Sequence, residues 1–425
     1  MFDLTDPEQL GLSSVRLARI ADWMNQLVAT GQLAGSSVLI NRGGHCGWFH
    51  ASGRLGLSTP DPIAKDTIFR IYSMTKPITS VAVMMLYEQG LFQLDDPISE
   101  FLPEFSSMRV YAGGVDDALR FEAARAPITI RQLLTHTSGL AHRMQDDSVV
   151  GELYRAHDID FGQGSGTLAD MVRNLAELPL LFQPGSRWNY GVSTDVLGRL
   201  VEVVSGKSLD KYFAHEIFAP LRMHDTAFSV AAKDIGRFAT LYTLSEGETD
   251  SARVTAPAKL SSQQTQRRLL QVDPALGGHY SRPVSLFSGG GGLTSTVGDY
   301  LRFALMLRND GLVDNNRLLG RKTVAYMRSN HLSGTLSSMG QPQFTSDMHS
   351  GSGLGFGLGF AVVLDPCQTQ VIGSTGEYFW AGVGGTHFWI DPEEDLIVIH
   401  MTQMRPSSLV PTRRTLRSLV YQALM

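Results

Sequence analysis

Two serine–lysine pairs with the spacing Ser-x-x-Lys are the residues of this 425-residue chain best suited to chemistry. One pair is Ser73 with Lys76, and the other is Ser208 with Lys211. On a helix, residues three apart lie on one face, so the lysine can reach the serine hydroxyl one turn away. A lysine that is desolvated there can lose its proton and act as a base toward the serine, which then becomes a nucleophile.

The context of the two pairs separates them. Ser208 begins an amphipathic helix, and we interpret it as a helix N-cap. Ser73 follows the extended apolar segment 67–71 and is followed by Pro77, a residue tolerated in a first helical turn. The helix behind Ser73 is apolar enough to be buried, and packing alone gives no reason for a lysine at its start. We therefore predict that Ser73 is a nucleophile with Lys76 as its partner.

Signatures of other enzyme classes are missing or incomplete. The motifs G-x-S-x-G and H-E-x-x-H do not occur. Residues 201–208 end in Gly-Lys-Ser but begin with valine where a phosphate loop needs glycine, and Thr294 breaks G-x-G-x-x-G at the glycine run 289–292. We interpret that run as a backbone turn leading into a helix. His136 and His387 are possible bases, but we interpret His136 as a loop-packing residue and His387 as a strand residue.

The segment around Ser73 resembles the active-site segment of a known enzyme superfamily. Residues 71–77 read Ile-Tyr-Ser-Met-Thr-Lys-Pro and are similar to that segment in serine β-lactamases and penicillin-binding proteins. More narrowly, they resemble the class C β-lactamase-like carboxylesterases called family VIII esterases. Four matching segments in family order are much more specific than one tetrapeptide. The other three are residues 130–140, 184–190 and 290–296.

The resemblance implies a set of catalytic groups. In this family a tyrosine from a loop of the helical domain completes a Ser-Lys-Tyr triad, and the matching residue is Tyr190. A phenol has a pKa of about 10, which a nearby lysine ammonium lowers, so Tyr190 could relay protons between Ser73, the leaving alkoxide and water. Whether Lys76 or Tyr190 is the acylation base stays open, because the pair titrates as a unit. The oxyanion hole would use the backbone N–H groups of Ser73 and Val383.

Other positions depart from the β-lactamase pattern. Class C β-lactamases have Asn two residues after the tyrosine, where this chain has Val192, and the Lys-Thr-Gly strand motif is absent. The matching segment contains Trp380, Ala381 and Gly382, where the esterase relatives commonly show residues like Trp-Gly-Gly. An apolar Trp in place of Lys favours an uncharged acyl or alcohol group over a β-lactam carboxylate. We expect a neutral ester to be bound by Tyr72, Val192, Trp380, Ala381 and Gly382.

Periodicity predicts sheet near both ends of the chain and helices in the middle. The resemblance implies the β-lactamase/transpeptidase-like fold, of class α/β plus all-α, with an antiparallel sheet flanked by helices and an inserted helical domain. We predict a discontinuous α/β domain of residues 1–72 and 293–425 and a mainly helical domain of residues 73–292, with the active site at their interface. Residues 229–285 are polar and predict a lid-like or surface excursion. Strands are expected at 36–41, 47–51, 67–71, 357–364, 369–372, 386–390 and 396–401, and the last helices at 297–308 and 413–423.

Composition excludes several classes of function. A net charge of −5, from 36 Lys+Arg and 41 Asp+Glu, gives no basic footprint for nucleic acid. No apolar run approaches the roughly 20 residues that span a bilayer. The acidic residues 1–6 do not resemble a secretory signal, so we expect a cytoplasmic protein without a membrane partner. Two cysteines, Cys46 and Cys367, are too few for a metal cluster or a disulfide framework, and we expect no cofactor or metal.

Together these patterns predict a serine carboxylesterase that hydrolyses neutral carboxylic esters through an acyl-enzyme on Ser73. Short acyl chains are expected, because nothing in the sequence indicates a deep apolar tunnel. Three alternatives stay open. They are an acyltransferase acting on a natural-product alcohol, a β-lactamase or D-alanyl-peptidase with weak esterase activity, and a non-enzymatic relative.

Overall fold

The structure is a computed structural model, and it describes most of the chain. The described residues are 2–114, 118–142, 148–159, 166–245, 268–341, 343–344 and 349–425. Residues 246–267, which belong to the predicted excursion 229–285, therefore lie outside the described residues.

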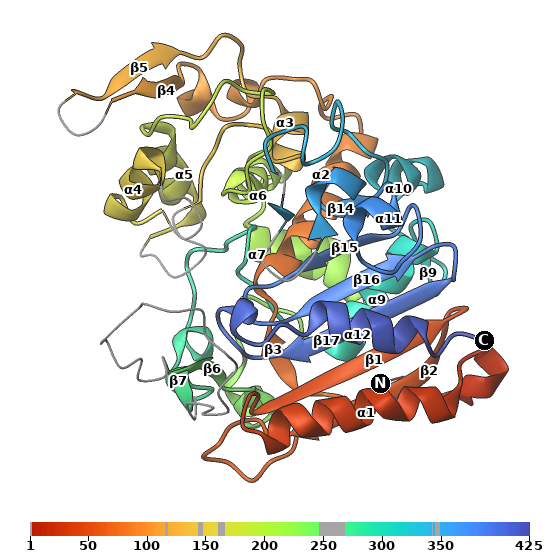
Figure 1. Ribbon diagram of the computed structural model, residues 1–425. Coiled ribbons are helices and arrows are strands. Elements are labelled where there is room, and N and C mark those ends of the chain that lie inside the picture. Colours follow the sequence, from red (N-terminus) through yellow and green to blue (C-terminus); the bar gives the residue numbers. More distant parts are fainter. Residues whose placement is uncertain are drawn as a thin grey trace, which may run out of the picture.

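A seven-stranded antiparallel sheet extends from the middle of the molecule to its lower right as drawn in Figure 1. Its strand order is β13-β14-β15-β16-β17-β1-β2, so strands from the two ends of the sequence pair side by side. Both termini therefore build one sheet, which confirms the predicted fold class. The strands are β1 (Gly35–Arg42), β2 (His45–Gly53), β13 (Leu354–Phe356), β14 (Ala361–Val363), β15 (Tyr378–Ala381), β16 (His387–Asp391) and β17 (Leu396–Thr402).

The N-terminal hairpin forms where the sequence predicts it. Gly43 and Gly44 close the turn between β1 and β2 with φ values of +61° and +83°, a region that glycine enters at little steric cost. In β1, the consecutive residues Val38, Leu39 and Ile40 are all fully buried. Neighbouring residues of a strand point to opposite faces, so both faces of this sheet are covered.

Helices cover the two faces. In β16, Phe388 has its ring 5.0 Å from that of Tyr300 in α9 (Val297–Arg308), while the adjacent Trp389 stacks on Tyr421 of α12 (Arg413–Tyr421) at 6.5 Å. The two helices therefore lie on opposite faces, and Figure 1 shows α12 beside α1 (Ser14–Ala29). Helix α1 begins at the N-cap Ser13 and buries Leu17, Ile20, Met24 and Leu27, which recur at three- and four-residue steps.

The middle of the chain is mainly helical and lies above the sheet in Figure 1. Helix α2 (Thr75–Glu88) is buried almost throughout and packs against α6 (Ser193–Ser205), so it connects the sheet to the helical part. The other α-helices among the described residues are α3 (Ile130–Leu134), α4 (Val149–Ala156), α5 (Leu168–Ala176), α7 (Leu209–Tyr212), α8 (Ala219–Leu221), α10 (Arg321–Met327) and α11 (Pro366–Thr369). Short strand pairs are β4 (Arg109–Gly113) with β5 (Arg120–Ala123), β9 (Leu312–Val313) with β10 (Asn316–Arg317), and β11 (Gln343–Phe344) with β12 (His349–Ser350).

One small sheet positions the site. Strand β3 (Ile68–Arg70) pairs antiparallel with β8 (Thr294–Thr296). The chain leaves β3 into the 3₁₀ turn η2 (Tyr72–Met74) and then α2, and it enters β8 from the glycine run 289–292. The pairing therefore brings that glycine run beside the Ser73–Lys76 segment, more than 200 residues away in sequence.

Two predicted strands differ from the structure. Residues 369–372 do not form a strand, because the Asp365 side chain accepts bonds from two backbone N–H groups and starts α11, which ends in left-handed Gln370 (φ +60°). The expected strand 357–364 is reduced to β14, because a turn at Gly359 (φ +107°) precedes it. Strand β15 was not predicted, although its residues were singled out for the site.

The segment 229–285 packs against the sheet in its described part. Strands β6 (Leu241–Leu244) and β7 (Leu269–Asp273) pair, and Tyr242 and Met404 share a β-bridge and an apolar cluster with α1 residues. The described residues of this segment thus pack on the body of the molecule through β6, whereas β7 is largely exposed at the surface. The predicted boundaries between the α/β domain and the helical domain, at residues 72/73 and 292/293, stay a prediction.

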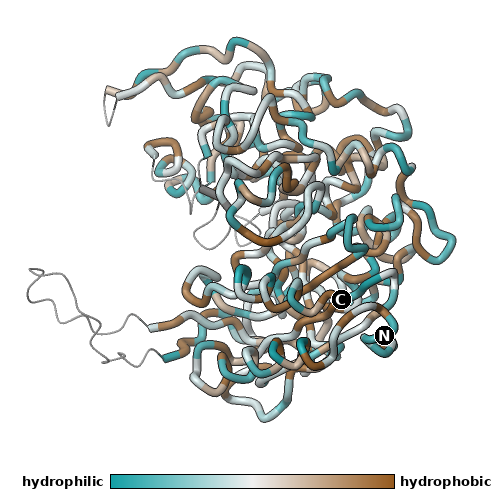
Figure 2. Tube along the Cα trace, turned by 45° about the vertical axis from the view of Figure 1, so that its right-hand side comes forward, coloured by the Kyte–Doolittle hydropathy of each residue, from teal (hydrophilic) through white to brown (hydrophobic). Residues whose placement is uncertain are grey.

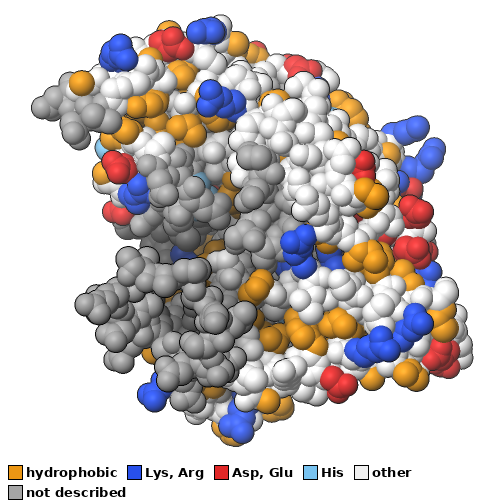
Figure 3. Space-filling view, viewed as in Figure 1, with side chains coloured by type: hydrophobic (Ala, Val, Ile, Leu, Met, Phe, Trp, Pro, Cys, Tyr) orange, Lys and Arg blue, Asp and Glu red, His pale blue; other side chains and the backbone are white. Residues whose placement is uncertain are grey.

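The surface and interior follow the hydropathy of the sequence. In Figure 2 apolar stretches run through the interior, and hydrophilic stretches lie mostly in outer turns and loops. On the face shown in Figure 3, basic and acidic side chains lie interspersed in small groups. Within the described residues, no helix is both long and apolar enough to cross a membrane.

Candidate active site

Ser73 lies in η2, between β3 and the start of α2. Its side chain is half-buried, whereas Lys76, one turn later, is only 1% exposed. The Nζ atom of Lys76 is 3.2 Å from Ser73 Oγ. The structure therefore brings the predicted pair into hydrogen-bond contact.

The surroundings of Lys76 favour its neutral form. Burial lowers the pKa of Lys76 from 10.5 to about 7, against the opposing effect of the Asp195 carboxylate. Its Nζ donates to the carbonyl oxygen of Gly290 at 2.6 Å and lies 4.6 Å from the centre of the Tyr190 ring. A lysine held this way can exchange a proton with Ser73 near neutral pH.

Tyr190 approaches Ser73 from the helical part. It lies in the loop that precedes α6, and its hydroxyl donates to Ser73 Oγ at 2.6 Å. The pKa of Tyr190 is raised, chiefly by burial, although its hydrogen bond with Ser73 acts in the opposite direction. The prediction that Lys76 lowers the pKa of this phenol is therefore wrong in direction, because burial raises the pKa and the negative charge of Asp195 adds to that effect. The phenol is protonated at neutral pH.

The glycine run is a third support of the site. Asp195, in the first turn of α6, accepts from Ser288 Oγ at 2.5 Å and from the backbone N–H of Gly290 at 3.1 Å. Thr79 of α2 donates to the carbonyl of Gly289 at 2.7 Å. Because both α2 and α6 hold this turn, the Gly290 carbonyl is fixed where it accepts from Lys76.

Backbone from the end of β15 packs closely on the Ser73 turn. A Cβ atom on Gly382 would lie 2.4 Å from the Ile71 carbonyl oxygen, and one on Gly384 would lie 2.8 Å from the Tyr72 ring. Only glycine permits this approach, which packs the two neighbours of Val383 against Ile71 and Tyr72, directly before Ser73. Within the described part of the chain, the backbone N–H groups of Ser73 and Val383 donate no hydrogen bond to another protein group.

An aromatic cluster surrounds Tyr190. Its ring lies 5.7 Å from that of Trp380, 5.1 Å from that of His136 and 6.4 Å from that of Trp188. Phe356 closes the group, 5.4 Å from Trp380. His136 is buried there, and burial, followed by the charge of Lys76, holds its pKa well below its ordinary value. The interpretation of His136 as a packing residue is confirmed.

The remaining residues of the predicted site lie nearby with different exposure. Ala381 is half-exposed at the end of β15, next to Trp380. Val192 is fully buried at the start of α6, and Tyr72 is 6% exposed with its ring perpendicular to that of Tyr280 at 6.3 Å. Their contact with substrate stays a prediction.

Two other residues considered in the sequence analysis, Ser208 and His387, lie outside this site. Ser208 occupies the N-cap position of α7, but its side chain makes no capping hydrogen bond. The Glu202 carboxylate accepts from the Leu209 backbone N–H at 3.1 Å instead. The N-cap role assigned to the Ser208 hydroxyl is therefore wrong. His387 is a buried strand residue of β16, as predicted.

Sequence reasoning missed several groups that touch the site. Asp195 and Ser288 gave no signal, because their contact depends on bringing α6 and the glycine run together. Phe356 is one apolar residue among many in the sequence. Among the described residues, no cluster of three or more His, Cys, Asp or Glu residues could hold a metal ion.

A serine that accepts hydrogen bonds from a buried lysine and a loop tyrosine, at the junction of an antiparallel sheet and a helical region, defines a serine hydrolase of the β-lactamase fold. The chain belongs to the Beta-lactamase family, which matches residues 20–422. Within it, the chain is similar to the family VIII esterases.

Individual relatives agree with this assignment. The sequence is 28% identical over 421 residues to Esterase EstB of Burkholderia gladioli, covering 98% of each chain. It is 37% identical over 352 residues to Protein Rv1367c of Mycobacterium tuberculosis, covering 81% of this chain and 79% of the relative. The solved structure of EstCE1, described as a hydrolase with promiscuous acyltransferase activity, is 30% identical with a TM-score of 0.75, covering 96% of this chain and 99% of that one.

Proposed function

We propose that the protein is a carboxylesterase that cleaves neutral esters through an acyl-enzyme on Ser73, with Lys76 and Tyr190 as the other catalytic residues. The observation that carries the proposal is the pair of hydrogen bonds on Ser73 Oγ, at 3.2 Å from Lys76 and 2.6 Å from Tyr190. The relationship to Esterase EstB supports the choice of ester bonds.

In the acylation step, Lys76 is the general base. Its lowered pKa of about 7 leaves much of it neutral at neutral pH, so it can take the proton from Ser73 as Oγ attacks the ester carbonyl carbon. Tyr190 is the better acid, because its raised pKa keeps the phenol protonated. It gives its proton to the alcohol oxygen as the carbon–oxygen bond breaks, and it regains one from the Lys76 ammonium.

Deacylation repeats these transfers with water. Neutral Lys76 takes a proton from water as the water oxygen attacks the acyl carbon. Ser73 then leaves with a proton, and the carboxylic acid is released. In both steps negative charge develops on the carbonyl oxygen, which the N–H groups of Ser73 and Val383 stabilise. Losing one such donor typically costs about 10²–10³-fold in rate.

The substrate is proposed to be an uncharged, short-chain ester. Trp380 presents an apolar ring beside Tyr190 and is backed by Phe356, and Val192 offers no amide for a β-lactam side chain. Apolar rings of this kind favour neutral acyl or alcohol groups. Turnover of a β-lactam such as nitrocefin is expected to be weak beside ester hydrolysis.

Transfer of the acyl group to an alcohol is a second candidate activity. The same acyl-enzyme serves both reactions, and EstCE1 is described as a hydrolase that also transfers acyl groups. The two differ in whether water or an alcohol attacks the acyl carbon. Product analysis with an added alcohol acceptor separates them: ester formed in excess of acid supports transfer.

The test of the proposed function is hydrolysis of p-nitrophenyl esters, from acetate to laurate, by the wild type and Ser73→Ala. Wild type should favour the short chains and carry an acyl adduct on Ser73, detected by mass spectrometry of the quenched enzyme. Ser73→Ala should show neither activity nor adduct. Full activity in Ser73→Ala would exclude Ser73 as the nucleophile, and nitrocefin turnover equal to ester turnover would exclude the esterase.

A further inference from the structure

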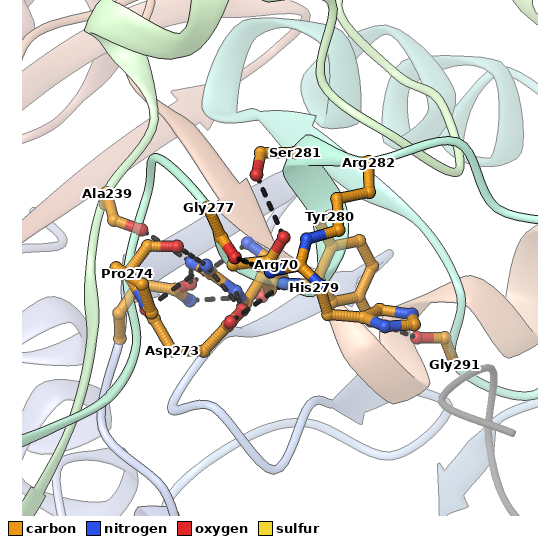
Figure 4. Close-up of polar contacts among 12 residues, drawn as sticks. Arg70, Ala239, Asp273, Pro274, Gly277, His279, Tyr280, Ser281, Arg282 and Gly291 are labelled. Carbon is orange, nitrogen blue, oxygen red and sulfur yellow. Dashed lines mark hydrogen bonds and ion pairs between the residues drawn. The ribbon is translucent and has the colours of Figure 1, made fainter.

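A fully buried arginine lies three residues before the nucleophile. Arg70 is the last residue of β3 and has no exposed surface. Burying a guanidinium is costly unless its charge is paired and its N–H groups are satisfied. Its Nε donates to Asp273 Oδ2 at 2.7 Å, and its terminal nitrogens donate to four further acceptors (Figure 4). These are the Ala239 carbonyl at 2.6 Å, Gln403 Oε1 at 3.1 Å, the Asp273 carbonyl at 3.2 Å and the Pro274 carbonyl at 3.1 Å.

The flat faces of the same guanidinium are covered by aromatic rings. The Arg70 Cζ atom lies 4.0 Å from the centre of the Phe238 ring and 5.6 Å from that of Tyr280. Gln403, which follows β17, also binds the backbone of Arg70: its Oε1 accepts from the N–H and its Nε2 donates to the carbonyl, both at 3.1 Å. The end of β3 is therefore tied to the large sheet and to β7.

This connection stands directly before a strained turn. Tyr72 has φ +43°, in the left-handed region that a residue with a bulky side chain rarely enters. Such a conformation persists only when its surroundings determine it, and it is found preferentially at functional sites. The Tyr72 ring is held by the Gly384 backbone and by Tyr280, which is also a partner of Arg70.

The partner carboxylate extends the same connection to Lys76. Asp273 Oδ1 accepts from the backbone N–H of His279 at 2.9 Å, which fixes the turn that carries Tyr280 (Figure 4). The Tyr280 hydroxyl donates to the Gly291 carbonyl at 3.3 Å. Gly291 follows Gly290, whose carbonyl accepts from Lys76.

We infer that Arg70 and Asp273 are positioning residues for the nucleophile: together they hold the left-handed turn at Tyr72 that presents Ser73 to Lys76. The inference rests on the proposed function and assigns a role to two residues that do not touch substrate. Displacement of a reacting atom by about 1 Å can cost about 10²-fold in rate, so a loosened turn is visible in turnover.

The test is Asp273→Asn, which keeps the shape of the side chain and removes its charge. Its matched control is Glu377→Gln, which breaks a second deeply buried ion pair, Arg417–Glu377 at 2.6 Å, beneath α12. Asp273→Asn should lower kcat about 10–100-fold with KM little changed. It should also slow the labelling of Ser73 by a fluorophosphonate probe by a similar factor. Glu377→Gln should leave kcat and labelling within about twofold while lowering the melting temperature.

Wild-type kcat and labelling rates in folded Asp273→Asn, with only a lower melting temperature, would overturn the inference. If Asp273→Asn does not fold, Gln403→Leu decides by the same two readouts, since it removes both bonds to the Arg70 backbone without stranding a charge. The proposed function is tested separately by Ser73→Ala. Activity in that variant would overturn the proposed function, whatever the result with Asp273→Asn. An inactive Ser73→Ala together with an unaffected Asp273→Asn overturns the positioning role alone.

Discussion

The two Ser-x-x-Lys pairs have the same spacing and opposite surroundings. Lys76 is 1% exposed and in contact with Ser73, and both α2 and α6 support the glycine turn whose Gly290 carbonyl accepts a hydrogen bond from it. Lys211, in α7, is exposed, and its serine stands beside a helix start that Glu202 already caps. The same spacing thus gives a buried hydrogen-bonded pair in one place and an exposed lysine in the other.

Burial makes the difference between the two pairs. An exposed ammonium keeps its water and its proton, whereas a buried one loses both. The first pair also has a partner from a distant loop, Tyr190, which contacts the serine from the other side. A tetrapeptide becomes a candidate catalytic site here because three segments far apart in sequence enclose it.

Removing the lysines gives the largest expected contrast. Lys76→Met should lower kcat for p-nitrophenyl acetate by about 10⁴-fold, at the upper end of what a general base contributes. Lys211→Met should leave kcat unchanged, because that lysine faces solvent. Steady-state kinetics on folded protein measures both. Equal losses in the two variants, or none in Lys76→Met, would remove the assignment of Lys76 as base.

The tyrosine is expected to contribute less than the lysine. Tyr190→Phe keeps the ring within its aromatic cluster and removes only the hydroxyl that donates to Ser73. A drop in kcat of about 10²-fold is expected. The loss should shrink for esters with good leaving groups such as p-nitrophenolate, which need no acid, and grow for ethyl esters. A loss independent of the leaving group would argue against Tyr190 as the acid.

The pH dependence should reveal the buried lysine. Only neutral Lys76 can accept a proton, so kcat/KM should rise with pH and level off around its pKa of about 7, falling about tenfold per unit below it. The free energy of unfolding should also depend on pH because of Lys76. Between about pH 7 and 10.5 the unfolded state binds the lysine proton and the folded state does not, so stability rises with pH across that window.

Lys76→Met is the control for the stability effect. Urea unfolding of the wild type and of this variant at several pH values should show their stability difference changing in favour of the wild type as pH rises from 7 to 10. A constant difference would mean that Lys76 keeps its proton in the folded state. The exposed Lys211→Met variant should follow the wild type throughout.

Local pattern was sufficient to predict much of the fold. Apolar periodicity and a serine cap predict helix α1, and periodicity also predicts helix α9. Glycines at the turn predict the β1–β2 hairpin. The strand expected at 369–372 does not form, because Asp365 and Pro366 start a short helix instead. The spacing of apolar residues does not reveal this helix start. Strand β15 was missed because its residues, of which the first three are buried, show no alternation.

The site was predictable only as far as its residues lie close in sequence or match a family segment. Ser73 and Lys76 are one turn apart, and the resemblance pointed to Tyr190. Asp195 and the Gly290 carbonyl act through contacts that exist only in the folded chain. The predicted lowering of the Tyr190 pKa was wrong for the same reason. The extent to which its ring is buried is known only once the chain is folded.

The smallest expected effect concerns the second pair. The Ser208 hydroxyl makes no capping bond, so Ser208→Ala should change the free energy of unfolding by less than about 0.5 kcal/mol. Glu202→Ala removes the carboxylate that accepts from Leu209 N–H and should cost about 1 kcal/mol, the usual loss on removing a cap. Neither should alter kcat. Urea unfolding distinguishes the two: a larger loss in Ser208→Ala than in Glu202→Ala would show that the serine, not the glutamate, caps α7.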